Sequence, residues 1–451
     1  MPRRSYLSKR FLIVIFLAFL FRFIGLSSLP PALNRDEAGI GWNAYSLLKT
    51  GRDEHNVPWP LNFKSIGDYK MPLYIYASIL PIKIFGLNEF SIRFWSAVAG
   101  VVSVIAVFYL TKNIYAALLM ALNPWAIFYS RIAYEANLAL ALFLVGLYLI
   151  ALKKDWGLIF WLLACLTYSS ALIFIPLIFI PTIFRYKPKL FWLVSFILIY
   201  GLIFISLWRI SSQKQNITIF SDPHLIDAYN QERVVKYAQN PLLTKLFFNK
   251  YIYFTGITAV NYLKTFSPSF LVIKGDNHPW HQIPGLGNFY IIEIILAIIA
   301  LRKIEFFYLF WLLLAPVASA ITIDAPHSTR AIFLLPVIII LASQGLAKVK
   351  RFLPIILAIY LLNFSYAANQ YIKLYPIKMA GTLPVNLKSE IVSQKNNQQI
   401  VLTGVHDSTY LYPLIYLKID PVIFQQTALW TPPDPAGLTH AYQFANILIK
   451  D

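Results

Sequence analysis

The sequence of 451 residues contains little cysteine and little charge. Cys165 is the single cysteine, which excludes an intrachain disulfide and gives no information on the redox compartment. Charged residues make up 13% of the chain, compared with roughly 25% in a soluble domain, whereas hydrophobic residues make up 58%. A soluble core does not account for this excess, so the composition indicates a membrane protein.

Motifs for soluble nucleotides and signs of internal duplication are also missing. The sequence has no Gly-rich phosphate loop, no Rossmann fingerprint, no Walker lysine motif and no fixed-period repeat. A soluble nucleotide donor is therefore not indicated. The net charge of +19 would suggest nucleic acid as the partner of a soluble protein, but here the basic residues fall in short clusters between apolar runs. That pattern reports membrane topology, and no nucleic-acid partner is expected.

The apolar runs are about 15 to 20 residues long, close to the length that crosses a ~30 Å hydrocarbon layer as a helix. The basic start, MPRRSYLSKR, is followed by an apolar run without a small-residue cleavage site, which predicts an uncleaved first span. Lys and Arg in short loops stay cytoplasmic, and eleven spans place every basic cluster, and the N-terminus, on that side. These spans are predicted at about 11–27, 94–111, 114–129, 137–152, 156–169, 171–184, 190–209, 288–301, 304–321, 331–346 and 352–369.

One apolar segment does not fit as a further span. YIYASILPIKIFG, residues 74–86, is short and contains a proline and a lysine. If it crossed the membrane, every later basic cluster would lie outside, so we expect an interfacial or re-entrant helix on the outer face. The outer face then contains residues 28–93, 130–136, 210–287 and 322–330.

The C-terminal part has a different pattern. IVLTG, at 400–404, predicts a strand and STYLYPLIYLKI, at 408–419, a partly amphipathic helix. We therefore expect an all-α polytopic membrane domain of about eleven transmembrane helices at 1–369, followed by a small extracytoplasmic α/β domain at 370–451. The expected location is the plasma or inner membrane.

Charged side chains close to membrane depth cost about 2.5–3.5 kcal/mol each and so tend to mark function. Three of the outer segments bring acids and cations together, namely Asp36, Glu37, Lys70, Arg93, Arg131, Glu135, Asp324, His327 and Arg330. Cations neutralise a departing phosphate, and a carboxylate accepts the proton of an attacking hydroxyl or amine. Arg also matches phosphate with paired donors. This set suits transfer from a donor whose phosphate is carried by a lipid.

The motifs resemble a known family. An Asp-Glu pair after the first span, YKMPLY at 69–74, NEFSIR at 88–93 and SRIAYE at 130–135 follow one another as in the protein O-mannosyltransferase and aminoarabinose-transferase superfamily, which are membrane glycosyltransferases of the GT-C type. The resemblance covers residues 1–210 well. It extends more loosely through FSPSFLVIKGDNHPWHQIPGLG at 266–287 and PHSTRAIFLLP at 326–336.

The resemblance implies an inverting, mannosyltransferase-like transfer of a sugar from a polyprenyl-phosphate carrier to a protein, lipid or glycan acceptor on the outer face. Asp36 matches the position of the catalytic base and Glu37 its neighbour. Lys70 matches the basic residue of the Lys-Pro-Pro-Leu-like motif, although Met71 replaces the first proline. Arg93 matches the arginine that heads the next span. Glu135 matches the second acidic position, which is often Asp in the family.

The remaining site predictions come from the residues themselves. Arg131 and Arg330 are expected to contact the donor phosphate with Lys70 and Arg93. His327 is expected to lie with Glu135 at the acceptor or second acidic site. Family members differ on a divalent metal cation, and the sequence leaves a metal open, with Asp36 and Glu135 as its candidate ligands. His278 and His281 form a His-x-x-His pair without a second ligand signature, which is weak evidence for a metal.

Simpler interpretations compete with these roles. Asp36 and Glu37 fit a helix cap, and Lys70 fits an interfacial anchor. Arg93 and Arg131 fit span-end anchors, and Arg131 is also placed to pair with Glu135. The acid and cations at 324–330 fit a local ion-pair network, and residues 53–55 look like a solvated loop.

The alternative function is a transporter or flippase of lipid-linked saccharides. Such a protein also needs many spans and cations near phosphate, but commonly shows internal repeats and polar groups near the midplane. Here the charged residues collect on one face and no repeat is present. These features favour an enzyme.

Overall fold

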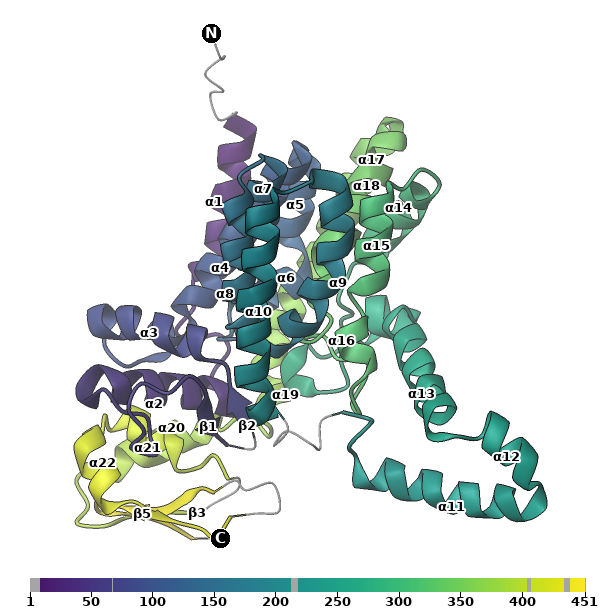
Figure 1. The fold of residues 1–451 in the computed structure, drawn as a ribbon. Coiled ribbons are helices and arrows are strands. Elements are labelled where there is room, and N and C mark those ends of the chain that lie inside the picture. The colour runs from purple at the N-terminus through teal and green to yellow at the C-terminus, as the bar shows by residue number, and fades with distance from the viewer. Residues whose placement is uncertain (1–8, 67, 212–217, 404–406, 434–438, 451) are drawn as a thin grey trace.

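A bundle of apolar helices forms most of the molecule. The computed structural model describes residues 9–66, 68–211, 218–403, 407–433 and 439–450. Most of the bundle helices run side by side, upright in the view of Figure 1. They are α1 (Lys9–Phe23), α4 (Glu89–Thr111), α5 (Ile114–Leu122), α6 (Pro124–Ser130), α7 (Glu135–Ala151), α8 (Leu158–Cys165), α9 (Ser169–Tyr186), α10 (Leu190–Ser211), α14 (Ile291–Leu301), α15 (Phe306–Leu314), α16 (Val317–Ala320), α17 (Leu334–Lys348) and α18 (Leu353–Asn369).

Each predicted span contains at least one of these helices, but the count of eleven spans is not confirmed. Within the described part of the chain, four helices are long and apolar enough to cross a membrane alone: α4, α9, the segment Leu190–Leu207 and the segment Lys350–Met379. The pair α6 and α7 passes as one span bent by 113°. The apolar helices α14, α17 and Phe306–Ala320 are shorter than 18 residues.

Two helices lie across the bundle axis at one end of the bundle (Figure 1). They are α2 (Arg35–Thr50) and α3 (Pro72–Phe85), and between them run the paired antiparallel strands β1 (Phe63–Ser65) and β2 (Asp68–Lys70). The helix predicted at 74–86 is therefore present, beginning at Pro72 because the proline supplies a favourable φ at the first helical turn.

Glycines let α2 lie close to its neighbours. A Cβ atom on Gly39 would come within 2.7 Å of the Ser65 hydroxyl, and one on Gly41 within 2.4 Å of the Ile92 side chain on α4. The AGIG stretch after the acidic pair thus fixes α2 against both β1 and α4.

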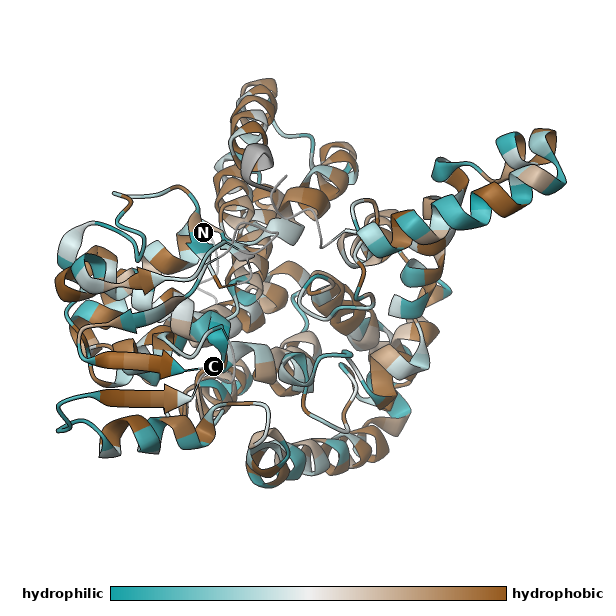
Figure 2. Cartoon of the chain, turned by 90° about the horizontal axis from the view of Figure 1, so that it is seen from below, coloured by the Kyte–Doolittle hydropathy of each residue, from teal (hydrophilic) through white to brown (hydrophobic). Residues whose placement is uncertain are grey.

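The long segment predicted at 210–287 is largely helical. It contains α11 (Pro223–Gln239), α12 (Pro241–Phe247), α13 (Lys250–Thr265) and short helical turns at Ser269–Ile273 and Pro279–His281. Figure 2 shows α11 and α12 projecting away from the rest of the molecule as an arm of mixed hydropathy. The later part of the segment returns to the bundle, where the Phe289 amide donates to the Leu271 carbonyl.

The C-terminal part forms a small α/β unit, in which a strand and a helix lie within the predicted segments 400–404 and 408–419. Its sheet has the order β3-β6-β5-β4, with β3 parallel to β6 and the other pairs antiparallel. The elements are α20 (Val385–Ser393), β3 (Ile400–Thr403), α21 (Leu411–Tyr416), α22 (Pro421–Thr427), β4 (Leu429–Trp430), β5 (Ala441–Phe444) and β6 (Ile447–Lys450). The preceding helix continues beyond residue 369 through a π-helical stretch (Gln370–Leu374) and α19 (Tyr375–Met379).

This C-terminal unit is docked on α2. The two share one hydrophobic cluster, which includes Trp42 and Phe424 in an edge-to-face contact with ring centroids 5.4 Å apart. Glu54 accepts a hydrogen bond of 2.9 Å from the Tyr410 hydroxyl at this contact. The expectation of a solvated loop at 53–55 is therefore wrong for Asp53 and Glu54, which are each only 2% exposed, because the C-terminal unit covers them.

Candidate active site

The acidic pair lies in the first turn of α2. Asn34 caps this helix. Its side-chain oxygen accepts a hydrogen bond from the backbone amide of Glu37 at 2.9 Å, and its backbone amide donates to the Glu37 carboxylate at 3.1 Å. This reciprocal arrangement is a capping box, so the helix-cap interpretation holds for Glu37. Asp36, one position earlier, takes no part in the capping box, and its side chain points to β2.

Glu37 and Arg93 form a buried ion pair between α2 and α4. The Arg93 Nε donates to Glu37 at 2.8 Å and Nη2 at 3.1 Å, and the two side chains are 0% and 1% exposed. The other Arg93 donors bind the carbonyl oxygens of Leu26, Pro30 and Ala32. All five N–H donors of Arg93 are thereby used within the protein, so the pair ties α4 to α2 and to the chain that links α1 with α2.

Asp36 pairs with Lys70, which ends β2. The Lys70 Nζ lies 2.8 Å from Asp36 Oδ1, with side-chain exposures of 10% and 29% respectively. Burial would raise the pKa of Asp36, but the charges of Lys70 and Arg35 outweigh it and lower that pKa to about 2. The carboxylate is therefore ionised, partly exposed and next to a cation.

Arg131 binds oxygens of two other segments. It donates to the Phe21 carbonyl at 3.0 Å, to the Leu29 carbonyl at 3.1 Å and to the Tyr371 hydroxyl at 3.2 Å. Arg330 instead pairs with Asp324 in the turn before α17. Burial would raise the pKa of Asp324, but its hydrogen bond with His278 and the charge of Arg330 hold it well below its usual range. The predicted ion-pair network at 324–330 is therefore present.

Residues from distant segments meet beside Tyr168, which precedes α9. Lys70, Glu135 and Arg330 all lie within electrostatic reach of its hydroxyl. Glu135 is buried at the first position of α7. Three of the predicted site residues, from three segments that are far apart in the sequence, thus converge on one region.

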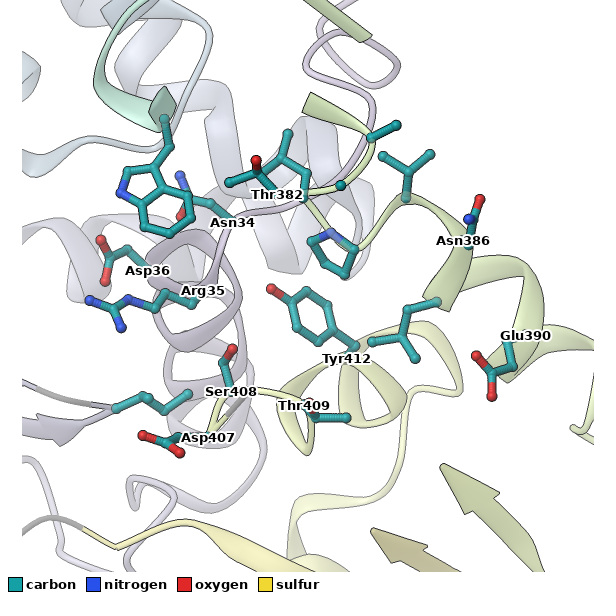
Figure 3. Close-up of a pocket in the computed structure, with 18 of the residues that line it drawn as sticks. Asn34, Arg35, Asp36, Thr382, Asn386, Glu390, Asp407, Ser408, Thr409 and Tyr412 are labelled. Carbon is teal, nitrogen blue, oxygen red and sulfur yellow. The ribbon is translucent and has the colours of Figure 1, made fainter. Parts of the chain in front are cut away.

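A pocket opens between Asp36 and the C-terminal unit (Figure 3). Its cavity volume is about 490 Å³. One wall contains the start of α2 with Asn34, Arg35 and Asp36, and Trp280 of the long outer segment. The opposite wall comes from residues between 380 and 390, from Thr403 and from 407–412, and includes Thr382, Asn386, Glu390, Asp407, Ser408, Thr409 and Tyr412.

A histidine and aspartate cluster lies near this pocket. The carboxylate of Asp276 lies 3.7 Å from Nδ1 of His281 and 3.6 Å from Nδ1 of His327. Candidate ligand atoms of these three residues all lie within 4.8 Å of one another. Among the residues that the structure describes, this is the group of three that could hold a metal ion, and the predicted ligands Asp36 and Glu135 are not part of it.

One member of this cluster, His281, lies close enough to Asp36 to interact with it electrostatically. His281 contributes to the low pKa of Asp36, which places the imidazole within electrostatic reach of that carboxylate. The Tyr134 hydroxyl donates to the carbonyl of Trp280, next to His281. These contacts join the loop at 276–282 to the 130–136 turn and to the pocket.

Sequence reasoning missed two parts of the site. His278 and His281 stood out as a His-x-x-His pair, but the third member of the cluster, His327, lies 46 residues after His281 on another segment, so spacing gave no link. Asp276 precedes His281 by five residues and was the available signal. The polar residues of the pocket wall from the C-terminal unit are hydroxyl, amide and carboxylate residues that belong to no motif.

Comparison with solved structures identifies the fold. ArnT from Cupriavidus metallidurans bound to undecaprenyl phosphate matches with a TM-score of 0.50 and 11% identity, over 92% of this chain and 87% of ArnT. The archaeal oligosaccharyltransferase AglB from Archaeoglobus fulgidus, in complex with an inhibitory peptide and a dolichol-phosphate, matches with a TM-score of 0.50 and 13% identity, over 91% of this chain and 64% of AglB.

A second Archaeoglobus fulgidus oligosaccharyltransferase structure, a complex with Zn and sulfate, gives a TM-score of 0.50 and 12% identity over 90% of this chain and 61% of that protein. This chain thus spans less than two thirds of the length of the oligosaccharyltransferase. No family model matches the sequence, and no curated protein matches it. The chain therefore has the fold of the GT-C membrane glycosyltransferases, as its motifs predicted.

Proposed function

We propose that this protein is an integral-membrane glycosyltransferase that moves a sugar from a polyprenyl-phosphate donor to an acceptor on the outer face of the membrane. The observation that carries the proposal is the Asp36–Lys70 pair at the wall of a pocket, in a chain with the GT-C fold. The donor class is supported by the undecaprenyl phosphate and dolichol-phosphate in the similar structures.

The proposed reaction is a single displacement. An acceptor hydroxyl or amine in the pocket attacks the anomeric carbon, and the bond from that carbon to the phosphate oxygen breaks. The polyprenyl phosphate leaves with the electron pair, and the acceptor proton passes to Asp36. Because attack and departure occur on opposite faces, the anomeric configuration inverts.

Lys70 has two partners in this scheme. In the absence of donor it binds Asp36 at 2.8 Å and keeps the carboxylate ionised. A donor phosphate that arrives beside Lys70 shares its charge, which raises the pKa of Asp36 and makes it a better proton acceptor. The same ammonium then neutralises the phosphate as it leaves.

The other predicted residues take different roles. Glu37 and Arg93 are positioning residues, since their hydrogen bonds hold α2 and therefore Asp36 in place. Arg330 and Arg131 are proposed to strengthen the positive electrostatic potential around the phosphate. Arg131 makes three hydrogen bonds within the protein and keeps its positive charge in this role. Glu135 and His327 are proposed to line the acceptor side, near Lys70 and the loop at 276–282 respectively.

The C-terminal unit is proposed to bind the acceptor. Hydroxyl, amide and carboxylate groups of its wall face Asp36 across the pocket (Figure 3). In this proposal the protein lies in the plasma or inner membrane with its N-terminus in the cytoplasm, and the pocket and the C-terminal unit on the outer side. The basic clusters between the apolar runs support that orientation.

The test is a transfer assay with the purified full chain in liposomes. A panel of polyprenyl-phosphate sugars is incubated with membrane-derived acceptors, and wild type is compared with Asp36→Asn and with Asp227→Asn on the exposed face of α11. We expect transfer by wild type and by Asp227→Asn, and a loss of at least 10²-fold in Asp36→Asn.

Anomeric configuration of the product, read by NMR, tests inversion. The transporter alternative makes a different prediction. Labelled lipid-linked sugar would cross the bilayer in wild type without any transfer product, so Asp36→Asn would have no product formation to lose.

A further inference from the structure

We propose that Asp276, His281 and His327 form a binding site for one divalent transition-metal ion, for which zinc is the best match. Two imidazoles and one carboxylate are a ligand set typical of zinc sites that keep the fourth position open. The inference concerns metal binding alone and does not depend on the proposed transfer reaction.

The distances suit such an ion. Zinc binds nitrogen and oxygen at about 2.0–2.2 Å, so two ligands of a tetrahedral site lie about 3.4 Å apart. In this structure the Asp276 Oδ2 is 3.6 Å from His327 Nδ1 and 3.7 Å from His281 Nδ1. Movements of a few tenths of an ångström at these contacts would bring the ligand atoms to coordination distance.

The carboxylate is held ready for a cation. Asp276 Oδ1 accepts from the His278 amide at 2.9 Å, and Oδ2 accepts from the Ser328 amide at 2.5 Å. The Asp276 side chain is 0% exposed, and its ion-pair partners among the described residues are two histidines, His281 and His327. A buried carboxylate without Lys or Arg among those partners is costly unless a further positive charge is present.

The histidines are also arranged for ligation. The Nδ1 atom of His281 is buried, faces the Asp276 carboxylate at 3.7 Å and makes no hydrogen bond of normal length to a described residue, so ligation of an ion there would displace no existing hydrogen bond. The Nε2 atom of His327 lies 3.5 Å from the Asp324 carboxylate, and a carboxylate at the other ring nitrogen orients an imidazole that binds a metal. The Thr329 amide, now 3.2 Å from His327 Nδ1, would give way to the ion.

A bound ion would join two segments that are far apart in the sequence. Asp276 and His281 belong to the loop before α14, and His327 belongs to the turn before α17. His281 also lies within electrostatic reach of Asp36, so the ion would place positive charge near the proposed base and beside the pocket.

The experiment measures bound metal in the full chain, purified in detergent with any affinity tag removed. Protein is stripped with a chelator, incubated separately with Zn²⁺, Mn²⁺ or Mg²⁺, desalted and analysed by mass spectrometry of the metal. We expect about one zinc per wild-type chain, less manganese and no magnesium. His281→Gln should lose the zinc, whereas His278→Gln, in the same loop but outside the triad, should retain it.

Two further measurements keep the result clear if a variant folds poorly. Thermal unfolding of the stripped proteins shows whether His281→Gln has the wild-type fold, and Co²⁺ in wild type gives the visible absorption of a four-coordinate site without any variant. Substoichiometric zinc in wild type overturns the proposal, as does zinc retained by His281→Gln or lost equally by His278→Gln. A protein that binds zinc but transfers no sugar would leave this inference intact and refute the proposed function.

Discussion

Asp36 and Glu37 are adjacent in the sequence, but their carboxylates bind different elements of the fold. Asp36 pairs with Lys70 and is 29% exposed, whereas Glu37 is 1% exposed and accepts from Arg93, from the Asn34 amide and from the Ala133 amide. One acid is therefore available to a substrate and the other holds α2 in place. Substitutions at the two positions should have different effects.

The first prediction concerns the pH dependence of Lys70→Gln. Lys70 lowers the pKa of Asp36 to about 2, so wild-type activity should show no acidic limb above about pH 3. Without the ammonium, the charge and the hydrogen bond of Lys70 no longer oppose the effect of burial, so the pKa of Asp36 rises and the acidic limb should move upward. Transfer should also fall about 10²-fold or more, since the group proposed to neutralise the departing phosphate is lost. The measurement is kcat/KM against pH.

A matched control for this variant is Lys83→Gln, an exposed lysine on α3. It should keep both the rate and the pH profile. If the pH profile of Lys70→Gln has the same shape as that of wild type, Lys70 does not set the pKa of the essential acid.

The second prediction is a stability difference between two ion pairs. Glu37→Gln leaves the Arg93 charge buried without a counter-charge and should cost about 3–5 kcal/mol of unfolding free energy. Glu232→Gln removes the half-exposed pair with Lys236 on α11 and should cost less than about 0.5 kcal/mol. Denaturant unfolding in detergent measures both, and equal values would contradict the positioning role.

The third prediction concerns pH and the docking of the C-terminal unit. Burial raises the pKa of Glu54 from 4.5 to about 7. The docked state therefore keeps its proton at pH values where the unfolded chain has lost it. Docking should be most stable below about pH 4.5, weaken as the pH rises to about 7, and remain constant above that, with a total change of the order of 3 kcal/mol.

Glu54→Gln keeps an acceptor for the Tyr410 hydroxyl but does not titrate, so its stability should be flat across this range. Thermal unfolding of wild type and Glu54→Gln at pH values from 4 to 8 gives the comparison. The same slope in both proteins would assign the pH dependence to another group.

The fourth prediction uses two helix glycines. A Cβ on Gly345 of α17 would lie 1.8 Å from the Leu296 carbonyl oxygen of α14, so Gly345→Ala must separate these helices and should cost about 2 kcal/mol or more. A Cβ on Gly201 of α10 meets nothing within 4 Å, so Gly201→Ala should be neutral or stabilising by up to about 1 kcal/mol. Thermal unfolding of both variants tests the contrast, and a stable Gly345→Ala would contradict this close approach of α14 and α17.

The apolar pattern was enough to predict the helices of the bundle, because each run must bury its backbone in a helix to lie in lipid. It could not set the number of crossings. Helices such as α8 and α14 are too short to span alone, and α6 and α7 are separated by a bend of 113° at residues 131–134, where no proline or glycine marks a break. The arm formed by α11 and α12 was predicted as a loop, since its apolar residues are mixed with charges.

The site was predictable where its residues belong to short motifs. Asp36 and Lys70 belong to two motifs on the same predicted face, so the sequence predicted that they lie in one site, and the structure shows them as an ion pair. The burial of Glu54 and the meeting of Asp276 with His327 were not predictable, because both depend on how distant segments fold against each other. From the sequence, a carboxylate in a polar stretch is expected to be solvated, and only the tertiary structure shows that another segment buries it.

The pocket has two walls that are far apart in the sequence. Asp36 and Lys70 precede the facing wall, whose described residues begin at Ala380. A nascent chain that has reached residue 379 therefore carries the acid and its lysine but has no cavity around them. The pocket can form beside Asp36 only after the C-terminal unit has been synthesised and has docked on α2.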